Sequence, residues 1–380
     1  MKRFDHLFEK IVSFDNLLLA AKRAQKGKRY QHNVAAFHFQ LEEQLLALKQ
    51  GLKDKSYQPG EYETFFIYDP KERMISAAPY RDRVIHHALC NIIEPIFEKT
   101  FIYDSYANRK GKGNHKAIDR YQFYAKKYPY VLKSDIRKFF PSLDHQILKQ
   151  EIRWKIKCKD TLWLIDTIID NSNPQQNQLE WFNGDNLFTP AERKKGLPIG
   201  NLTSQFWGNV YLNRFDHFIK EELAVPGYIR YVDDFVLFGE NKSQLNQWKW
   251  ELTTYLSKLR LIPHPNKTQI KRTKDGVPFL GFQIFPTYRY VRKEKIRRYR
   301  RYLKSNMKLR AQGKLGPQKL EDQLNAWLGH IRNGQSQRLE YNIFWYLRQS
   351  GVELHYSSRG SWRLPAEVFN MKAGVLEQQR

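Results

Sequence analysis

Residues 228–238 read Tyr-Ile-Arg-Tyr-Val-Asp-Asp-Phe-Val-Leu-Phe, and this stretch decides the fold. Two apolar runs, rich in β-branched and aromatic residues, flank a pair of adjacent aspartates, and such runs are typical of strands. Aspartate tolerates turn geometry and hydrogen-bonds to nearby backbone groups. The stretch therefore predicts a β-hairpin that carries Asp233 and Asp234 at its tip.

Two neighbouring carboxylates repel each other, and burying both without a cation is very costly. A divalent metal ion resolves the conflict, because hard cations prefer carboxylate oxygens as ligands. A solvated turn whose acids have no function is the commoner explanation of a bare Asp-Asp pair. The decision between the two therefore rests on the remainder of the chain.

The composition indicates a partner that carries many negative charges. The chain has 380 residues, a net charge of +26 and 14% aromatic residues. Such a basic excess is typical of proteins that bind nucleic acid or an anionic membrane. No apolar run approaches the roughly 18 residues of a membrane span, and acids occupy the N-terminus where a signal peptide is apolar. We therefore expect a cytoplasmic protein that binds nucleic acid and no membrane.

The two cysteines, Cys90 and Cys158, exclude a disulfide framework and a cysteine-based zinc site. Apolar periodicity predicts helices over 4–25, 34–52, 317–332 and 337–349, and a strand-turn-strand unit over 61–80 with Asp69-Pro70 at its turn. Residues 173–195 are polar and predict an insertion loop. Arginine and lysine crowd the segment that follows residue 290, which favours contact with a phosphate backbone.

A third acid and a glycine loop complete the pattern. Asp135 ends a short apolar strand that begins near residue 128, where enzymes with mixed sheets often place catalytic groups. An N-cap of the following helix explains Asp135 as well. Residues 196–213 begin with glycines and a proline and continue as a helix that carries Ser204 and Gln205 in its early turns. Such a loop allows the backbone to approach a ligand closely.

This order of motifs, from about residue 60 to 310, resembles that of reverse transcriptases. Tyr-Val-Asp-Asp at 231–234 matches the family's most specific signature, and Asp135-Ile136 with the aromatic Phe140 resembles its first catalytic motif. The resemblance implies an α+β right-hand polymerase with fingers, a palm built from an antiparallel sheet plus helices, and a helical thumb. The implied ranges are 1–60 (N-terminal helices), 61–130 (fingers), 131–286 (palm, with the insertion 173–195), 287–350 (basic thumb) and 351–380 (tail).

The resemblance also implies the catalytic chemistry. Asp135 and Asp233 would bridge two Mg²⁺ ions (or Mn²⁺), Asp234 would support them, and the carbonyl of Ile136 would complete one site. Lys267 would lie near the leaving pyrophosphate as a proton donor. The residues implied in nucleotide binding are Lys71, Arg73, Arg109, Phe140 (which would exclude a ribose 2′-OH), Ile199 and Gly200. Those implied in primer and template binding are Ser204, Gln205, Phe279, Leu280, Gly281, Arg297 and Arg301.

One departure from the family pattern suggests a subtype. Most reverse transcriptases have Gln-Gly in the glycine loop, whereas this chain has Ile199-Gly200, followed by Ser204-Gln205. The pattern resembles the enzymes of diversity-generating retroelements, which relate to group II intron enzymes and copy a template RNA with errors at adenines. Isoleucine offers only apolar contact where glutamine can hydrogen-bond the nucleotide's sugar. Losing about 1 kcal/mol of polar contact loosens discrimination between correct and incorrect pairs.

The implied partners are the template RNA, the RNA/cDNA duplex, dNTPs and a small basic helical accessory protein, often pentameric, of a bacterial or phage-encoded element. Two alternatives remain. One is another bacterial reverse transcriptase, of the group II intron, retron or abortive-infection type. The other is a non-catalytic, maturase-like scaffold that binds RNA, against which the intact Asp135, Asp233 and Asp234 argue.

Overall fold

The computed structural model describes residues 2–68, 72–173, 179–352, 355–356 and 362–363. The chain forms two compact units. The first comprises residues 1–117 and 130–270, and the second comprises 118–129 and 271–380. Helix α6 (Asn114–Lys127) runs from the first into the second. The predicted division into fingers, palm and thumb remains a prediction.

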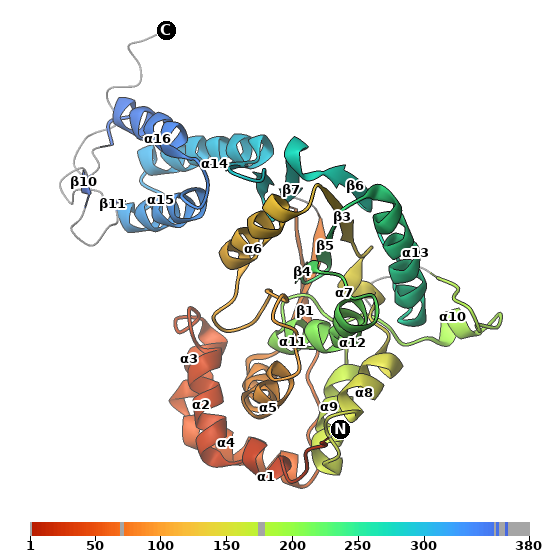
Figure 1. Cartoon of the computed structure of the whole chain (residues 1–380). Coiled ribbons are helices and arrows are strands. Elements are labelled where there is room, and N and C mark those ends of the chain that lie inside the picture. Colours follow the sequence, from red (N-terminus) through yellow and green to blue (C-terminus); the bar gives the residue numbers. More distant parts are fainter. Residues whose placement is uncertain (1, 69–71, 174–178, 353–354, 357–361, 364–380) are drawn as a thin grey trace. The chain divides into compact units, whose positions relative to one another are not determined.

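The first unit combines helices with two sheets, one of two strands and one of four strands whose edge strand β6 continues into the second unit (Figure 1). Its strands are β1 (Glu63–Ile67), β2 (Arg73–Ala77), β3 (Tyr130–Asp135), β4 (Gly227–Tyr231), β5 (Asp234–Gly239) and β6 (Gln269–Arg272). Its helices are α1 (Phe8–Ile11), α2 (Phe14–Ala24), α3 (His32–Phe39), α4 (Leu41–Lys53), α5 (Tyr80–Glu98), α7 (Phe139–Ser142), α8 (His145–Arg153), α9 (Lys159–Asp170), α10 (Thr189–Glu192), α11 (Leu202–Tyr211), α12 (Asn213–His217), a π-helix (Phe218–Glu222) and α13 (Lys242–Lys258).

The central sheet has the strand order β4-β5-β3-β6, and β5 is antiparallel to both β3 and β4. Residues 235–239 of β5 are buried on both faces. Their apolar, largely aromatic and β-branched side chains suit a strand packed on both sides. The sheet is therefore a rigid base for the residues at its ends.

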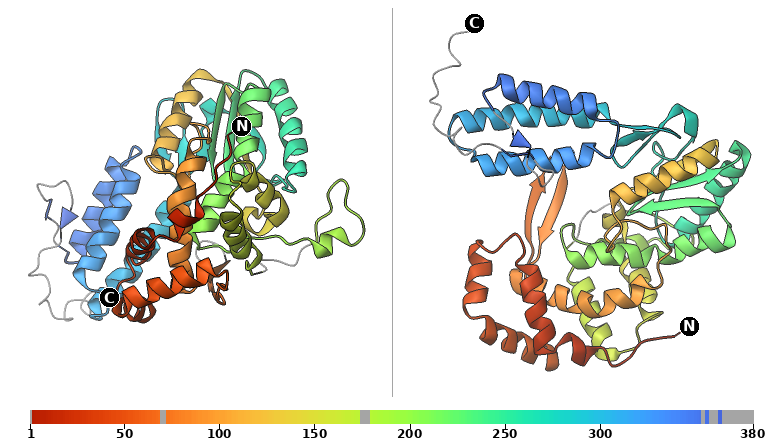
Figure 2. Two further views of the ribbon diagram at one scale, coloured as in Figure 1. Left: turned by 90° about the horizontal axis from the view of Figure 1, so that it is seen from below. Right: turned by 60° about the vertical axis from the view of Figure 1, so that its left-hand side comes forward.

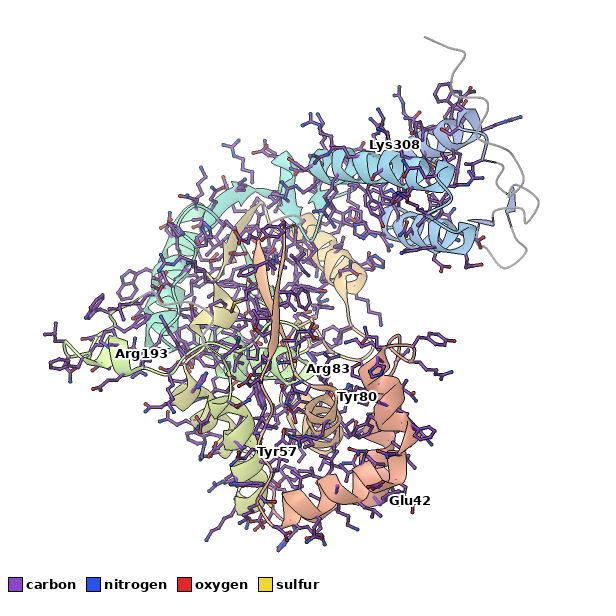
Figure 3. All side chains as sticks on the ribbon, turned by 180° about the vertical axis from the view of Figure 1, so that it is seen from behind. Glu42, Tyr57, Tyr80, Arg83, Arg193 and Lys308 are labelled. Atoms are coloured by element: carbon purple, nitrogen blue, oxygen red, sulfur yellow. The ribbon has the colours of Figure 1, made fainter. Side chains whose placement is uncertain are left out.

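Helix α5 lies at the centre of the helical packing. Val84, Ile85, Ala88, Leu89 and Ile93 are fully buried, and the helix packs against α2 and α11. Buried tyrosine hydroxyls also link this helix to its neighbours (Figure 3). Tyr80 donates to the Ala21 carbonyl at 3.0 Å, and Tyr57 donates to Asp82 at 3.0 Å.

The strand-turn-strand prediction for 61–80 is confirmed by the pairing of β1 with β2, while its predicted turn, Asp69-Pro70, lies outside the described residues. The single helix predicted over 4–25 is wrong. The chain breaks at Ser13, whose side chain caps α2 by accepting from the backbone N–H of Asn16 at 3.3 Å. The helix predicted over 34–52 is likewise divided, into α3 and α4.

The second unit contains a three-stranded sheet, β7 (Val277–Phe279), β8 (Phe282–Ile284) and β9 (Arg289–Val291), a 3₁₀ turn (Thr273–Asp275) and a short pair, β10 (His355–Tyr356) and β11 (Trp362–Arg363). Helices α14 (Lys293–Ala311), α15 (Pro317–Ile331) and α16 (Gln337–Gln349) lie side by side (Figure 2). Tyr299 stacks on Trp327 with ring centroids 4.2 Å apart, which joins α14 to α15. The predicted helices 317–332 and 337–349 are confirmed. None of the helices in the described ranges is long and apolar enough to cross a membrane.

Candidate active site

Strand register brings the three predicted carboxylates together. Asp135 is the last residue of β3 and lies directly opposite Asp234, the first residue of β5. Asp233 precedes it in the turn, and the backbone N–H of Ile136 donates to the Asp233 carbonyl at 3.0 Å. Residues almost a hundred positions apart in the sequence are therefore neighbours at the end of two paired strands. The metal-binding role of the Ile136 carbonyl remains a prediction.

The predicted hairpin is confirmed, with a shift of one residue at its tip. Tyr231 pairs with Asp234, so the two turn residues are Val232 and Asp233. Val232 has φ 57°, in the left-handed region. This conformation is unusual for a β-branched residue, and such strain persists only where the surroundings hold it. The backbone conformation of the turn is consequently constrained, and it fixes the position of Asp233.

Burial dominates the electrostatics of the acids. It raises the pKa of Asp233 to about 6, and the charge of Asp135 adds to the effect. Burial likewise raises the pKa of Asp234 to about 6, although the Lys133 ammonium, 3.4 Å away, opposes the shift. Lys267 lies 2.7 Å from Asp135 through its Nζ atom. Two ammonium groups thus partly balance three crowded carboxylates.

The donor set fits divalent cations that the substrate helps to bind. Oδ1 of Asp234 is buried and has no hydrogen-bond partner within the described part of the chain. In that part of the chain, no three or more His, Cys, Asp or Glu side chains form a group that could hold a metal ion. Mg²⁺ commonly uses one or two carboxylates and completes its shell with substrate phosphates and water. The site has the acids for such binding and leaves the other ligands to the nucleotide.

The glycine loop lies against β2. The backbone N–H of Ser76 donates to the Ile199 carbonyl at 3.1 Å, and the Ile199 side chain is half-buried. Gly200 has φ 119°, and a Cβ there would lie 3.1 Å from Cγ2 of Ile75. Both the backbone conformation and the space favour glycine. The loop therefore presents Ile199 and Gly200 from a fixed backbone.

The same loop is fastened to the predicted sugar-contacting residue. The Leu197 N–H donates to the Phe140 carbonyl at 2.9 Å. The half-buried Phe140 ring packs at 5.3 Å against Phe139, and α11 approaches both rings closely at Gly208. Phe140 and the glycine loop, predicted to contact one nucleotide, are thus held together in the first unit.

Helix α11 positions the two polar residues predicted to contact primer or template. Ser204 is buried and its hydroxyl has no partner among the described residues, whereas Gln205 is exposed. Gln205 is therefore available to a ligand, and the binding role of both residues remains a prediction.

The basic residues predicted to bind the triphosphate differ in their surroundings. Arg73 is exposed at the start of β2, and Lys71 lies outside the described residues. The Arg109 guanidinium binds Glu98 at 2.7 Å and the carbonyls of Ile102 and Ser105 at 2.7 and 2.8 Å. These bonds would have to break before Arg109 could hold a triphosphate, so its role stays a prediction.

The remaining predicted binding residues belong to the second unit. Leu280 and Gly281 both have positive φ, 45° and 92°, in the connection between β7 and β8, and Phe279 is buried. Arg297 and Arg301 are exposed on α14, one helical turn apart. Their predicted contacts with primer and template remain predictions.

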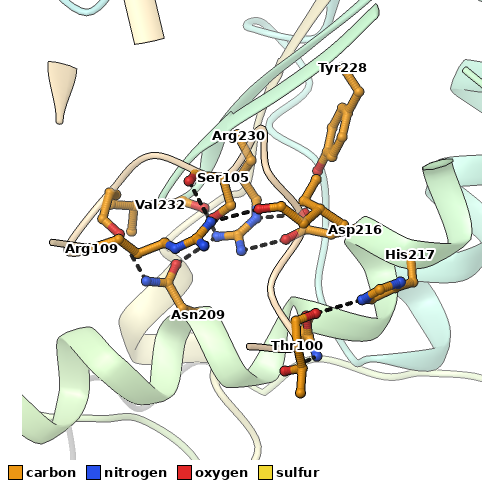
Figure 4. A network of polar contacts seen from close by, with 12 residues as sticks. Thr100, Ser105, Arg109, Asn209, Asp216, His217, Tyr228, Arg230 and Val232 are labelled. Carbon is orange, nitrogen blue, oxygen red and sulfur yellow. Dashed lines mark hydrogen bonds and ion pairs between the residues drawn. The ribbon is translucent and has the colours of Figure 1, made fainter. Parts of the chain in front are cut away.

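Sequence reasoning missed two charged residues next to the acids. Lys133 precedes Asp135 by two positions, and strand periodicity places both on one face of β3. Arg230 lies within an apolar strand and is completely buried against Asp216 of α12 (Figure 4). A charged residue in a run of apolar strand positions was the available signal, but the partner depends on tertiary packing.

The chain is similar in sequence to several known proteins. Residues 68–284 match the family model "Reverse transcriptase (RNA-dependent DNA polymerase)". Protein YkfC of Escherichia coli (strain K12) is 24% identical, over 63% of this chain and 71% of YkfC. The group II intron-encoded protein LtrA of Lactococcus lactis subsp. cremoris is 22% identical, over 64% of this chain but only half of LtrA.

Among solved structures, the chain resembles the apo telomerase of Candida tropicalis, with 14% sequence identity and a TM-score of 0.47, over 71% of this chain and 57% of the telomerase chain. The family match covers more than half of the chain, and it includes the acids, the glycine loop and the strands that carry them. The predicted α+β class is confirmed by the mixed sheets and helices of both units. The chain belongs to the reverse transcriptase (RNA-dependent DNA polymerase) family.

Proposed function

We propose that this protein synthesises cDNA from a template RNA by two-metal nucleotidyl transfer, and that it does so with frequent errors at template adenines. The observation that supports the polymerase chemistry most directly is the register of β3 and β5, which pairs Asp135 with Asp234 beside Asp233. The observation that supports the error-prone subtype is Ile199, held half-buried in the glycine loop.

Asp135, Asp233 and Asp234 would hold two Mg²⁺ ions, which would lower the pKa of the primer hydroxyl and neutralise charge on the triphosphate. The primer 3′ hydroxyl would pass its proton to solvent water, its oxygen would bond to the α-phosphorus, and the bond from that phosphorus to the leaving pyrophosphate would break. Lys267, now 2.7 Å from Asp135, would donate a proton to the leaving pyrophosphate. Phe140 would contact the sugar and disfavour a 2′-OH.

A test of the chemistry uses purified protein, template RNA, a primer, Mg²⁺ and dNTPs. The wild type is expected to extend the primer, and the Asp233→Ala/Asp234→Ala variant to lose synthesis while retaining its thermal unfolding transition. Undiminished synthesis by that variant would refute the assignment of these acids. The scaffold alternative predicts RNA binding without synthesis by either protein.

Ile199 provides the test of the subtype. Because glutamine can hydrogen-bond where isoleucine cannot, Ile199→Gln is expected to reduce misincorporation opposite template adenine by roughly fivefold, the equivalent of about 1 kcal/mol. Sequencing of cDNA made on one defined template measures the error at all four bases. Ile199→Leu serves as the matched apolar control, and an error spectrum shared by all three proteins would contradict the role of Ile199.

The proposal includes an accessory protein, small, basic and helical, from the same genetic element. Co-purification and cDNA synthesis with and without the product of a neighbouring gene test this part. A nearly repeated template/variable pair of sequences next to the gene would support the diversity-generating subtype over the retron, abortive-infection and group II alternatives.

A further inference from the structure

Arg230 is a buried charge placed under the catalytic turn. It lies in β4, and its side chain has no exposed surface. Its Nε and Nη2 atoms donate to the two carboxylate oxygens of Asp216 at 2.7 and 2.6 Å, and Nη1 donates to Oδ1 of Asn209 at 3.1 Å. Nη1 also donates to the carbonyl of Val232 at 3.1 Å (Figure 4). The guanidinium thus forms an ion pair with Asp216 and also donates a hydrogen bond to the backbone of the turn.

The bond to Val232 acts on the orientation of Asp233. The Val232 carbonyl belongs to the peptide group that joins Val232 to Asp233, and Val232 is the turn residue with φ 57°. The peptide group on the other side of Asp233 is fixed by the Ile136 N–H at 3.0 Å. Both peptide groups that flank Asp233 are therefore held by hydrogen bonds, one from Ile136, the residue after β3, and one from Arg230.

The same network joins the turn to neighbouring segments. Asn209 lies on α11, the helix that follows the glycine loop, and its Nδ2 donates to the Ala107 carbonyl at 2.9 Å. The backbone of Arg230 bonds to Asp104 and Tyr106, each at 3.0 Å. Arg230 consequently connects the acidic turn to the helix that follows the glycine loop.

Stability alone is a weak explanation for this pair. Burial of two charges carries a desolvation cost that their attraction only partly repays, and well-packed apolar replacements are often equally stable or more stable. The hydrogen bond to a strained backbone carbonyl is a property that apolar replacements lack. We propose that Arg230 is a positioning residue, which holds the Val232–Asp233 peptide so that the Asp233 carboxylate points at its metal. This inference rests on the proposed metal-binding role of Asp233.

The central experiment separates positioning from stability. Arg230→Met/Asp216→Leu removes the charge pair together and leaves the Val232 carbonyl without its donor. We expect kcat for primer extension to fall about 30–100-fold, because displacement of a catalytic group by about 1 Å can have an effect of that size. KM for dNTP should change less than about threefold, and Mn²⁺ binding measured by electron paramagnetic resonance should weaken about tenfold or more.

Two variants provide the comparison. Asp216→Asn keeps the guanidinium and its bond to Val232 but leaves the buried charge unbalanced, so we expect lower thermal stability with kcat reduced less than about fivefold. Arg193→Met/Asp185→Leu removes another almost fully buried arginine–aspartate pair, in the segment between α9 and α11, and should leave kcat and Mn²⁺ binding unchanged. Under the proposal, kcat falls in the variants that lose the hydrogen bond to the Val232 carbonyl, whatever their unfolding temperature.

The proposal would be overturned if folded Arg230→Met/Asp216→Leu had the same kcat and Mn²⁺ affinity as the wild type. It would also be overturned if kcat decreased in proportion to the unfolding temperature across all the variants. If the double variant does not fold, Arg230→Lys, which lacks the planar guanidinium that serves Asp216 and Val232 together, is compared with Asp216→Asn. Equal kcat in these two would then overturn it. Failure of the proposed function is distinguishable, because in that case either the wild type makes no cDNA or Asp233→Ala/Asp234→Ala remains active.

Discussion

At the scale of single residues, burial opposes the ionisation of the Asp233 and Asp234 carboxyl groups. Burial, assisted by Asp135, raises the pKa of Asp233 from 3.8 in the unfolded chain to about 6. The folded protein therefore binds the proton more tightly than the unfolded chain. Without metal, its stability falls as pH rises from about 4 to 6, and the loss is complete above pH 6. This conflict is the expected property of a site that binds cations.

Replacement of the charge should therefore stabilise the metal-free protein while it removes activity. We expect Asp233→Asn to raise the unfolding temperature by roughly 2–6 °C at pH 8, with an upper limit of about 3 kcal/mol, and to have little effect near pH 4. Thermal unfolding followed by circular dichroism in EDTA at both values of pH measures this. A gain of equal size at the two values would show that the effect does not come from ionisation of Asp233.

Single residues also show what the sequence could reveal about the site. Asp135, Asp233 and Ile199 lie in short local motifs, so their roles could be predicted without the fold. Arg230 could not be assigned, because its partner Asp216 is on α12 and its acceptor is a backbone carbonyl. The ion pair of Arg109 with Glu98 could not be predicted either, because it depends on the conformation of the segment between α5 and α6.

At the scale of elements, apolar periodicity predicted the uninterrupted helices but not the positions at which a helix is interrupted. Helices α15 and α16 carry uninterrupted apolar stripes and were predicted closely. The break between α1 and α2 depends on a single cap, Ser13, within a continuing apolar pattern. The shift of one residue in the acidic turn has a similar origin, since the turn residues are decided by the pairing of β4 with β5 and not by the composition of the turn.

The contact of the glycine loop with β2 gives a prediction at this scale. Gly200→Ala must tolerate φ 119° and a Cβ that lies 3.1 Å from Ile75, whereas Gly113→Ala meets a similar φ, 113°, in open space. We expect Gly200→Ala to lower the free energy of unfolding by roughly 1–2 kcal/mol more than Gly113→Ala. Urea unfolding of both variants measures the difference. Equal losses would mean that backbone strain alone, without close packing on β2, requires glycine at 200.

At the scale of the whole molecule, the excess of 26 positive charges needs a partner, and α14 carries a dense share of it. Its buried residues Tyr299 and Leu303 face the helical packing, while many of its basic side chains are exposed. Such an amphipathic distribution assigns one face to the core and the other to solvent or to a polyanion. Charge density alone does not distinguish these two roles, but the salt dependence of binding does.

Arg297→Gln/Arg301→Gln should weaken binding of an RNA/DNA duplex and reduce its dependence on salt. Each lost phosphate contact lowers the slope of log K against log salt by roughly 0.7–0.9, so the double variant should lose about 1.4–1.8. Fluorescence anisotropy titrations from roughly 50 to 300 mM KCl, on both sides of the ionic strength at which the Debye length is ~10 Å, give the slope. Arg338→Gln/Arg348→Gln removes the same charge from exposed positions of α16 and serves as the control. If both double variants reduce the slope equally, net charge and not a phosphate-binding face of α14 accounts for the affinity.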